Sequence, residues 1–350
     1  MTEGFRSARR GFVPVSAVEW NLDAAATYSA NFGENHTQWT DIASFDSVPK
    51  ADVVVGGPPC QGFSNLGSKD PDDERNTLWR AYMRVVLEAD PQVFILENVD
   101  RFAKTPEFEM LMTELRTGCL KRWKWHTAKV LNAADYGVPQ RRLRTIILAS
   151  RVGPIQHPSP THAKHPSGRL KGWTSVESAI VGLPENPDTT ELPDQFVDVF
   201  GRRVPGIFKM RDLHFGRRPT ARSLERYDHV PPGGGRFDLP EHLLPSCWAN
   251  KPTGTTDVMG RMRWDSPSLT IRTEFYKPEK GQYLHPQWDP DDVGRRVNRV
   301  ITHQEAALLQ TFPTNYLWCG SKIEIARQIG NAVPPLLAKA LALTVARTLR

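Results

Sequence analysis

Short apolar runs alternate with segments of helical periodicity over the first 150 residues. Buried strands are predicted at residues 12–20, 53–55, 92–96, 125–131 and 145–149, and helices at 22–31, 70–89 and 106–120. Asn21 can cap the first of these helices, and Asp70 followed by Pro71 is a strong start for the second. The alternation predicts an α/β fold, with a largely parallel sheet and helices on both of its faces.

The pattern changes after residue 154. Proline, histidine, glycine and lysine cluster through residue 172, and between 184 and 298 no strand–helix alternation survives, which predicts a smaller, irregular domain. Regular structure returns at the capping box Thr302–Glu305, ahead of a helix at 306–310. Residues 328–335 are predicted to form a turn that leads into a last helix at 336–349. The predicted domains are therefore 1–184, 185–298 and 299–350, the last of which completes the first.

Composition narrows the class of protein. A chain of 350 residues exceeds what one hydrophobic core usually supports. The net charge of +6 and the pI near 9.2 favour a polyanionic partner. The four cysteines form no CxxC pair, which argues against a zinc site or a disulfide framework. No apolar run approaches the roughly 18 residues of a membrane span, and no signal peptide is evident, so we expect a soluble cytoplasmic protein.

Two strand ends carry side chains that suit covalent catalysis. Cys60 follows the strand at 53–55 across a glycine–proline turn, and Glu97 follows the strand at 92–96. A thiolate that adds to an electron-poor ring, together with an acid at a ring nitrogen, would make a neighbouring carbon nucleophilic. A cysteine after a strand is more often simply buried, so these residues alone leave both interpretations open.

Two further features have competing interpretations. Glu19 ends the first predicted strand, where an acid commonly binds ribose hydroxyls, but a solvated carboxylate is an equal alternative. The segments 261–264 (RMRW) and 269–272 (LTIR) combine basic side chains with aromatic or β-branched ones. This combination favours a nucleic-acid surface, and a solvated rim of arginines is the alternative.

Five segments resemble the motifs of the cytosine-C5 DNA methyltransferases, in the order found in that family. Residues 56–64 (GGPPCQGFS) are similar to the catalytic motif, 97–99 (ENV) to the ENV motif, 140–144 (QRRLR) to the QRRxR motif, 328–334 (QIGNAVP) to the C-terminal motif, and Arg299 with 302–313 to the motif before it. The resemblance implies the fold of S-adenosylmethionine-dependent methyltransferases, Rossmann-like with a mixed sheet. It also implies that residues 185–298 form a target-recognition domain.

The resemblance implies a reaction as well, which is DNA methylation at cytosine C5. A methyl group from S-adenosylmethionine would produce 5-methylcytosine. Cys60 would attack C6 of the ring, Glu97 would engage N3 and the exocyclic amine, and Arg144 would contact O2. Arg142 would help to order the pocket. Because C6 is inaccessible within a stacked duplex, base flipping is required.

The same resemblance assigns the cofactor and the partners. Glu19 would hold the ribose of S-adenosylmethionine, Trp20 would stack on the adenine, and Asp41 would accept from adenine N6. The other expected cofactor-binding residues are Ile42, Pro58, Leu78, Asn331 and Ala332. The expected partners are double-stranded DNA and, in a restriction-modification system, a companion endonuclease. We expect a monomer that binds neither a metal nor a membrane.

One feature of the family is not found in the sequence. The family begins with a strand and a Gly-rich turn, D-x-F-x-G-x-G-G, which cradles the methionine part of the cofactor, and residues 2–6 (TEGFR) resemble the segment after that turn. We therefore expect the first strand of the sheet to be missing from residues 1–350, either because translation is assigned to an internal methionine or because the protein is truncated. The alternative functions are a DNA-binding remnant that binds no cofactor and an RNA cytosine-5 methyltransferase.

Overall fold

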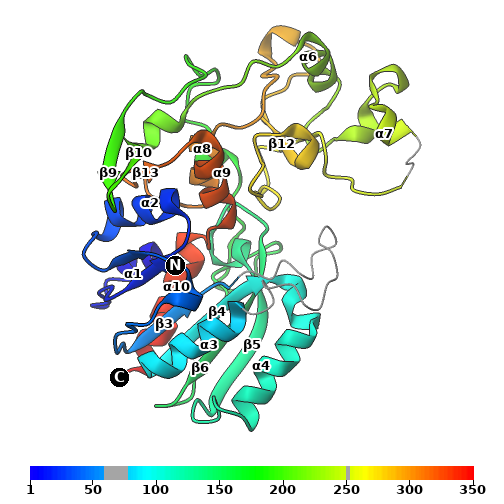
Figure 1. Cartoon of the computed structure of the whole chain (residues 1–350). Coiled ribbons are helices and arrows are strands. Elements are labelled where there is room, and N and C mark those ends of the chain that lie inside the picture. The colour runs from blue at the N-terminus through cyan, green and yellow to red at the C-terminus, as the bar shows by residue number, and fades with distance from the viewer. Residues whose placement is uncertain (59–77, 250–252) are drawn as a thin grey trace.

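The computed structural model describes residues 1–58, 78–249 and 253–350, and a four-stranded sheet forms the centre of its larger part (Figure 1). The strand order is β3 (Val53–Gly56), β4 (Val93–Val99), β6 (Leu143–Ser150) and β5 (Trp125–Asn132). β3 and β4 run parallel, whereas β6 runs antiparallel to both of its neighbours. The prediction of a largely parallel sheet is therefore wrong for β6, whereas β3, β4 and β5 all run in one direction. Residues 133–142 between β5 and β6 are too few for the crossover that a parallel pair requires.

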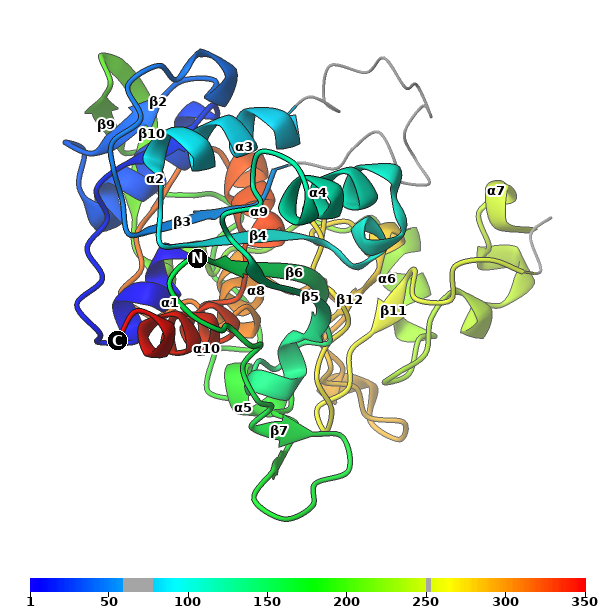
Figure 2. The same cartoon turned by 90° about the horizontal axis from the view of Figure 1, so that it is seen from below.

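Helices cover both faces of this sheet, as predicted. Side chains alternate across β4, so Val93 and Ile95 pack on one face and Phe94 and Leu96 on the other. The first face is covered by α1 (Thr2–Ser7) and α10 (Pro335–Thr348), and the second by α3 (Leu78–Ala89) and α4 (Pro106–Arg116) (Figure 2). Burial on both faces explains why β4 has a continuous apolar run instead of an alternating pattern.

A second, smaller parallel sheet consists of β1 (Ala17–Glu19) and β2 (Thr37–Trp39), which α2 (Leu22–Phe32) connects. Within the described residues, β3 is hydrogen-bonded on one side only, and neither β1 nor β2 belongs to the central sheet. The three valines of β3 accordingly stay half-buried, although such a run is typical of an interior strand.

Residues 196–208 lie within the predicted recognition domain but pair with the C-terminal part of the chain. β9 (Phe196–Val199) and β10 (Arg202–Phe208) form an antiparallel sheet with β13 (Trp318–Cys319). Their core also includes α5 (Glu177–Ile180), α8 (His303–Leu309) and α9 (Lys322–Asn331). The chain therefore returns to the main body more than once between residues 184 and 298.

The more separate lobe has its own small core. It contains α6 (Ala221–Asp228), α7 (Ser246–Ala249), β11 (Gly260–Arg261) and β12 (Gln282–Leu284), and Figure 1 shows α6 and α7 at the far side of the molecule from the sheet. Its buried apolar residues are Tyr227, Val230, Leu239, Met259, Leu284 and Val300. We call this part the distal lobe. Two short strands, β7 (His162–Ala163) and β8 (Lys171–Gly172), lie between it and the sheet in sequence.

Two predicted helix boundaries are wrong. The helix expected at 106–120 ends at Arg116, because the Glu114 carboxylate accepts from the backbone N–H of Cys119 and turns the chain. Gln328–Asn331, which were expected to form a turn, are the last residues of α9. Ser321 caps that helix by accepting from Glu324 N, a signal that the motif match obscured. The predicted start at Asp70 lies outside the described residues.

In the described part of the chain, no single helix is long and apolar enough to cross a membrane. α9 and α10 meet this requirement only when they are taken together as a pair bent by 42°. Both helices contribute buried side chains to the cores described above.

Candidate active site

Glu97 and Arg144 form an ion pair at the edge of the central sheet where β4 ends. Arg144 lies on β6 directly opposite Val99, because the antiparallel register pairs these two positions. Arg144 Nε lies 2.7 Å from Glu97 Oε1, and both side chains are mostly buried. Arg144 also donates to its neighbouring carbonyl, that of Leu143. The pair gives the carboxylate one orientation, which is needed by a group that must meet a ring nitrogen.

The glycines at the end of β3 are required by space, since neither has a positive φ. A Cβ on Gly56 would come within 2.3 Å of the Tyr82 ring, and a Cβ on Gly57 within 2.9 Å of Glu97 Oε2. The backbone after β3 therefore passes directly beside the Glu97 carboxylate.

Asn98 fixes the start of the turn that leads to the predicted nucleophile. Its Nδ2 donates to the Pro58 carbonyl at 3.0 Å. Cys60 follows Pro58 by two positions and lies outside the described residues. The structure thus places Glu97, Arg144 and Pro58 together and leaves the position of Cys60 untested.

Arg142 is completely buried and joins three parts of the chain. From the β6 side of the sheet it donates to Ile271 O at 3.0 Å and to Gly330 O at 2.7 Å. Burial, together with the positive charge of Arg144, lowers the pKa of Arg142 to about 9, so the guanidinium remains charged at neutral pH. Its described partners are backbone carbonyls, so Arg142 stabilises the segments next to the site.

Gln140 supports the same junction, and sequence reasoning gave it no role. Its Nε2 donates to Gln310 Oε1, and its Oε1 accepts from the backbone N–H of Ile271. Gln310 in turn donates to Ile329 O. These amides are buried and paired, so the loop at 268–272 and the end of α9 are held against the strand that carries Arg144. Only the polar identity of Gln140 next to a buried strand could have signalled this role.

The residues predicted to bind the cofactor lie around the ends of β1 and β2. Glu19 pairs with Trp39 in the parallel register, and Thr40 N donates to Glu19 O. Burial raises the pKa of Glu19, against the opposing effect of the backbone N–H groups of Asn21 and Trp20. The Trp20 side chain is 74% exposed, and its carbonyl accepts from the indole N–H of Trp39 at 2.9 Å.

The other residues predicted to bind the cofactor belong to neighbouring elements. Asp41 caps the short helix η1 (Ile42–Ser44) by accepting from Ala43 N, and Arg84 donates to Ile42 O. Ile42 packs with residues of α3, whose first described residue is Leu78. Asn331 and Ala332 form the end of α9, and the Asn331 side chain is exposed.

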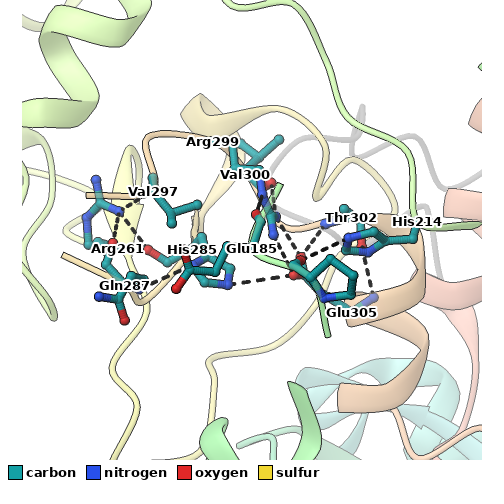
Figure 3. Close-up of polar contacts among 11 residues, drawn as sticks. Glu185, His214, Arg261, His285, Gln287, Val297, Arg299, Val300, Thr302 and Glu305 are labelled. Atoms are coloured by element: carbon teal, nitrogen blue, oxygen red, sulfur yellow. Dashed lines mark hydrogen bonds and ion pairs between the residues drawn. The ribbon is translucent and has the colours of Figure 1, made fainter. Parts of the chain in front are cut away.

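A buried polar network ties the distal lobe to the main body (Figure 3). The Glu305 carboxylate accepts from both terminal nitrogens of Arg299, at 2.8 and 2.7 Å, and from Thr302 N. Arg299 Nε donates to Glu185 O, so the chain segment that leaves the main body is bound to the segment that returns. The capping box at 302–305 is confirmed, and Glu305 serves the ion pair as well as the helix start.

His285 extends this network toward the lobe. Its Nε2 lies 3.7 Å from Glu305 Oε1, and its backbone carbonyl accepts from Arg261 Nη1 at 2.6 Å. Burial lowers the pKa of His285 to about 3, so the ring is neutral at physiological pH. Figure 3 shows Arg261, His285 and Glu305 in one continuous line of contacts.

The predicted basic surface at 261–264 and 269–272 is wrong for its first arginine. Arg261 is completely buried, and it donates to the carbonyls of residues 227, 230, 285, 287 and 297 and to Asn298 Oδ1. Arg263 and Arg272 are exposed, but each pairs with an aspartate, Asp265 and Asp257 respectively. A guanidinium with five donors can join several loop carbonyls at once, which explains its position at the centre of an irregular lobe.

Comparison with known proteins identifies the class that this fold and site define. The family model for C-5 cytosine-specific DNA methylases matches residues 1–347. The chain is 31% identical to the Type II methyltransferase M1.HphI of Haemophilus parahaemolyticus, over 95% of this chain and 81% of that protein. It is 33% identical to the Type II methyltransferase M.XorII of Xanthomonas oryzae pv. oryzae, over 99% and 82%.

Solved structures agree on the fold. A prophage-encoded E. coli protein, described as a DNA modification methyltransferase, superposes with a TM-score of 0.67 at 22% identity and covers 99% of this chain and 96% of its own. DNMT2 of Spodoptera frugiperda gives a TM-score of 0.58 at 17% identity, over 98% and 96%. The protein is thus a DNA cytosine methyltransferase with an α/β methyltransferase fold. The chain belongs to the C-5 cytosine-specific DNA methylases, and within them it resembles the bacterial modification type.

Proposed function

We propose that this chain methylates C5 of a flipped-out cytosine in double-stranded DNA through a covalent bond between Cys60 and C6. The Glu97–Arg144 pair carries the proposal, because it directs a mostly buried carboxylate beside the backbone that leads to Cys60. A carboxylic acid fixed next to a nucleophile is the arrangement that ring activation requires.

The proposed reaction begins with the addition of Cys60 to the cytosine ring. The Cys60 thiolate forms a bond to C6 while Glu97 delivers a proton to N3, so the electron pair of the ring becomes available at C5. C5 then takes the methyl group of S-adenosylmethionine, with S-adenosylhomocysteine as the leaving group. Loss of the C5 proton to a base, rupture of the S–C6 bond and return of the N3 proton to Glu97 then restore the ring and release the thiolate. Arg144 holds Glu97 in position and contacts O2 of the base.

The described residues fit the adenosine side of S-adenosylmethionine, which would supply an electrophilic methyl group when bound. Glu19 ends its strand partly buried, with a carboxylate that can accept from ribose hydroxyls, and the exposed ring of Trp20 is available for stacking. Asp41 lies two positions after Trp39, the strand partner of Glu19, so its carboxylate can accept a hydrogen bond from adenine N6. Ile42, Leu78, Pro58, Asn331 and Ala332 would complete the surroundings.

The target sequence would be read by residues of the predicted domain 185–298, while the main body holds the phosphates. The relatives named Type II methyltransferases support a role in a restriction-modification system with a companion endonuclease. We propose a monomer as the active form. Light scattering of the purified chain tests this proposal, and digestion of host DNA by endonucleases tests for site protection.

Tritium transfer from labelled S-adenosylmethionine tests the reaction. Wild-type protein should label duplex DNA and leave tRNA unlabelled, Cys60→Ser should abolish transfer, and Glu97→Gln should reduce it by about 10²–10⁴-fold. A duplex with 5-fluorocytosine at the target should give a denaturation-resistant adduct with wild type and none with Cys60→Ser. Retained transfer by Cys60→Ser would refute the mechanism.

Cofactor binding separates an enzyme from a DNA-binding remnant. Calorimetric titration of wild-type protein with S-adenosylmethionine should show binding, and Glu19→Gln should weaken it. If wild-type protein binds duplex DNA but shows no binding of the cofactor, the remnant interpretation replaces the enzyme.

A further inference from the structure

A loop at residues 161–173 combines concentrated positive charge with a position at the active-site edge of the sheet. The loop contains three arginines and lysines, and neither aspartate nor glutamate occurs in residues 136–176. The predicted recognition domain, 185–298, has seventeen residues of each sign and is neutral overall. The positive charge that attracts a polyanion is therefore concentrated in the main body and not in the domain expected to read bases.

The strand register places the segment that holds this loop at the same edge of the sheet as Glu97. Arg144 pairs with Val99 on one side of β6 and with Leu131 on the other, so β4 and β5 end at the same edge. The chain leaves β5 at Asn132 and forms the short helix η5 (Ala133–Tyr136), from which the loop is held.

Three hydrogen bonds attach the loop to that helix. Asp135 O accepts from Thr161 N at 2.9 Å, and Asp135 Oδ1 accepts from Trp173 Nε1 at 2.9 Å. The Tyr136 hydroxyl donates to Pro158 O at 2.9 Å. These bonds bind both ends of the loop to η5, so its direction is set by the sheet.

The loop itself is closed and turned. β7 and β8 pair His162 with Lys171, and Gly168, with φ +59°, lies in a turn where Leu170 N donates to Ser167 O. A non-glycine residue would be strained at that φ. Figure 2 shows the loop projecting from β7 beyond the body of the protein, on the side of the sheet away from α3 and α4.

Its cations point to solvent. Lys164, Arg169 and Lys171 are all exposed, as is His165 between them. Within the described residues, no acidic group pairs with any of the three. Cations that are exposed, unpaired and held on a closed loop meet phosphate without first breaking an internal contact.

We propose that this loop binds the phosphate backbone of DNA beside the target site, extending the grip of the protein past the base pairs that it reads. The proposal rests on the DNA methyltransferase function and adds to it a surface that none of the sequence motifs includes. Because phosphate contacts release counterions, each one adds about 0.9 to the slope of log affinity against log salt.

The test compares the full chain with a loop variant, Lys164→Ala/Arg169→Ala/Lys171→Ala. A matched variant, Arg116→Ala/Lys121→Ala/Lys124→Ala, removes the same charge from exposed positions around the start of β5, at the opposite edge of the sheet. Fluorescence anisotropy would measure binding to two labelled duplexes of about one and three helical turns, both centred on the site that wild-type protein protects in DNase footprinting.

On the long duplex, the loop variant should bind at least roughly tenfold more weakly at low salt and lower the salt slope by about 2–3. The matched variant should behave as wild type, and the loss should be much smaller on the short duplex. The variant Lys164→Arg/Lys171→Arg, which keeps the positive charge, should bind as tightly as wild-type protein.

An unchanged salt slope in the loop variant on the long duplex would overturn the proposal, and so would an equal loss in the matched variant. Equal melting temperatures of the variants exclude unfolding as the cause. Methyl transfer by wild-type protein is measured separately. Its absence would refute the proposed function, whereas the binding comparison would still decide the role of the loop.

Discussion

At the scale of the residue, the Glu97 carboxylate can occupy its position because residue 57 is a glycine and has no side chain. Gly57→Ala would place a methyl group 2.9 Å from Glu97 Oε2, which is the end of a side chain and can move. The variant should therefore fold normally but transfer methyl groups about 100-fold more slowly, because a displacement of about 1 Å at a reacting group costs that much. Single-turnover rates and melting temperatures, measured on the same samples, check both parts.

Gly153→Ala is the control for that substitution, since a Cβ there would have no neighbour within 4 Å and its φ is not positive. It should leave both the rate and the melting temperature unchanged. A large loss of stability in Gly57→Ala would contradict the claim that only the carboxylate has to move.

Single residues also show what the sequence can predict. Glu97 and Pro58 could be placed together because the ends of neighbouring parallel strands share an edge of the sheet. Arg144 joins them because β6 runs antiparallel to β4, and the strand–helix alternation did not predict that direction. Arg261 could not be assigned correctly, since all but one of its hydrogen-bond acceptors are backbone carbonyls, of residues up to 36 positions away. No pattern of side chains records contacts that are made mostly to backbone.

At the scale of the element, capping signals predicted helix starts well. Asn21 and Thr302 each cap a helix with the side chain expected from the sequence. α9 was missed, because its last turn coincides with a segment that the family resemblance presents as a motif. Residues 328–331 belong both to this helix and to the family motif. The clearer physical signal was Ser321, a good N-cap residue that indicates a helix beginning at residue 322.

Gly330 makes the position of α9 testable. In a helix, glycine to alanine normally stabilises by about 0.5–1 kcal/mol. A Cβ on Gly330 would lie 2.5 Å from the backbone of Arg272 and Thr273, which cannot move independently. Gly330→Ala should therefore destabilise by about 1–3 kcal/mol in urea unfolding.

Gly182→Ala, where a Cβ would have no neighbour within 4 Å, should change the free energy of unfolding by less than about 0.5 kcal/mol. An increase in stability of Gly330→Ala would mean that α9 does not pack against residues 272–273.

At the scale of the whole molecule, the distal lobe depends on a polar centre as much as on its small apolar core. Arg261→Met would leave several buried carbonyls without a donor, and each unsatisfied group costs about 1–3 kcal/mol. Hydrogen exchange should therefore rise across the distal lobe while the central sheet stays protected. Arg263→Met, at an exposed arginine two positions away, should leave exchange unchanged. Equal exchange in both variants would contradict the role of Arg261.

Acid should destabilise the whole molecule through its buried histidines. Burial lowers the pKa of His285 to about 3 and that of His303 to about 4, whereas an unfolded histidine has a pKa near 6.5. Between these values the unfolded chain binds protons that the folded chain does not, so unfolding becomes more favourable as the pH falls. Each histidine should cost about 2 kcal/mol at pH 5 relative to pH 7.

His285→Asn isolates one of these contributions, because an asparagine oxygen can accept from Gln287 N as the ring nitrogen Nδ1 does. Whatever the stability of the variant at pH 7, its loss of unfolding free energy between pH 7 and pH 5 should be smaller by about 2 kcal/mol. Glu305 does not contribute to this difference between pH 7 and pH 5. Burial alone would raise the pKa of Glu305, but the hydrogen bonds and positive charge of Arg299 lower it, so the carboxylate stays ionised over this range. Urea unfolding at both pH values measures the difference, and equal losses in the two proteins would show that the His285 ring is not buried in its neutral form.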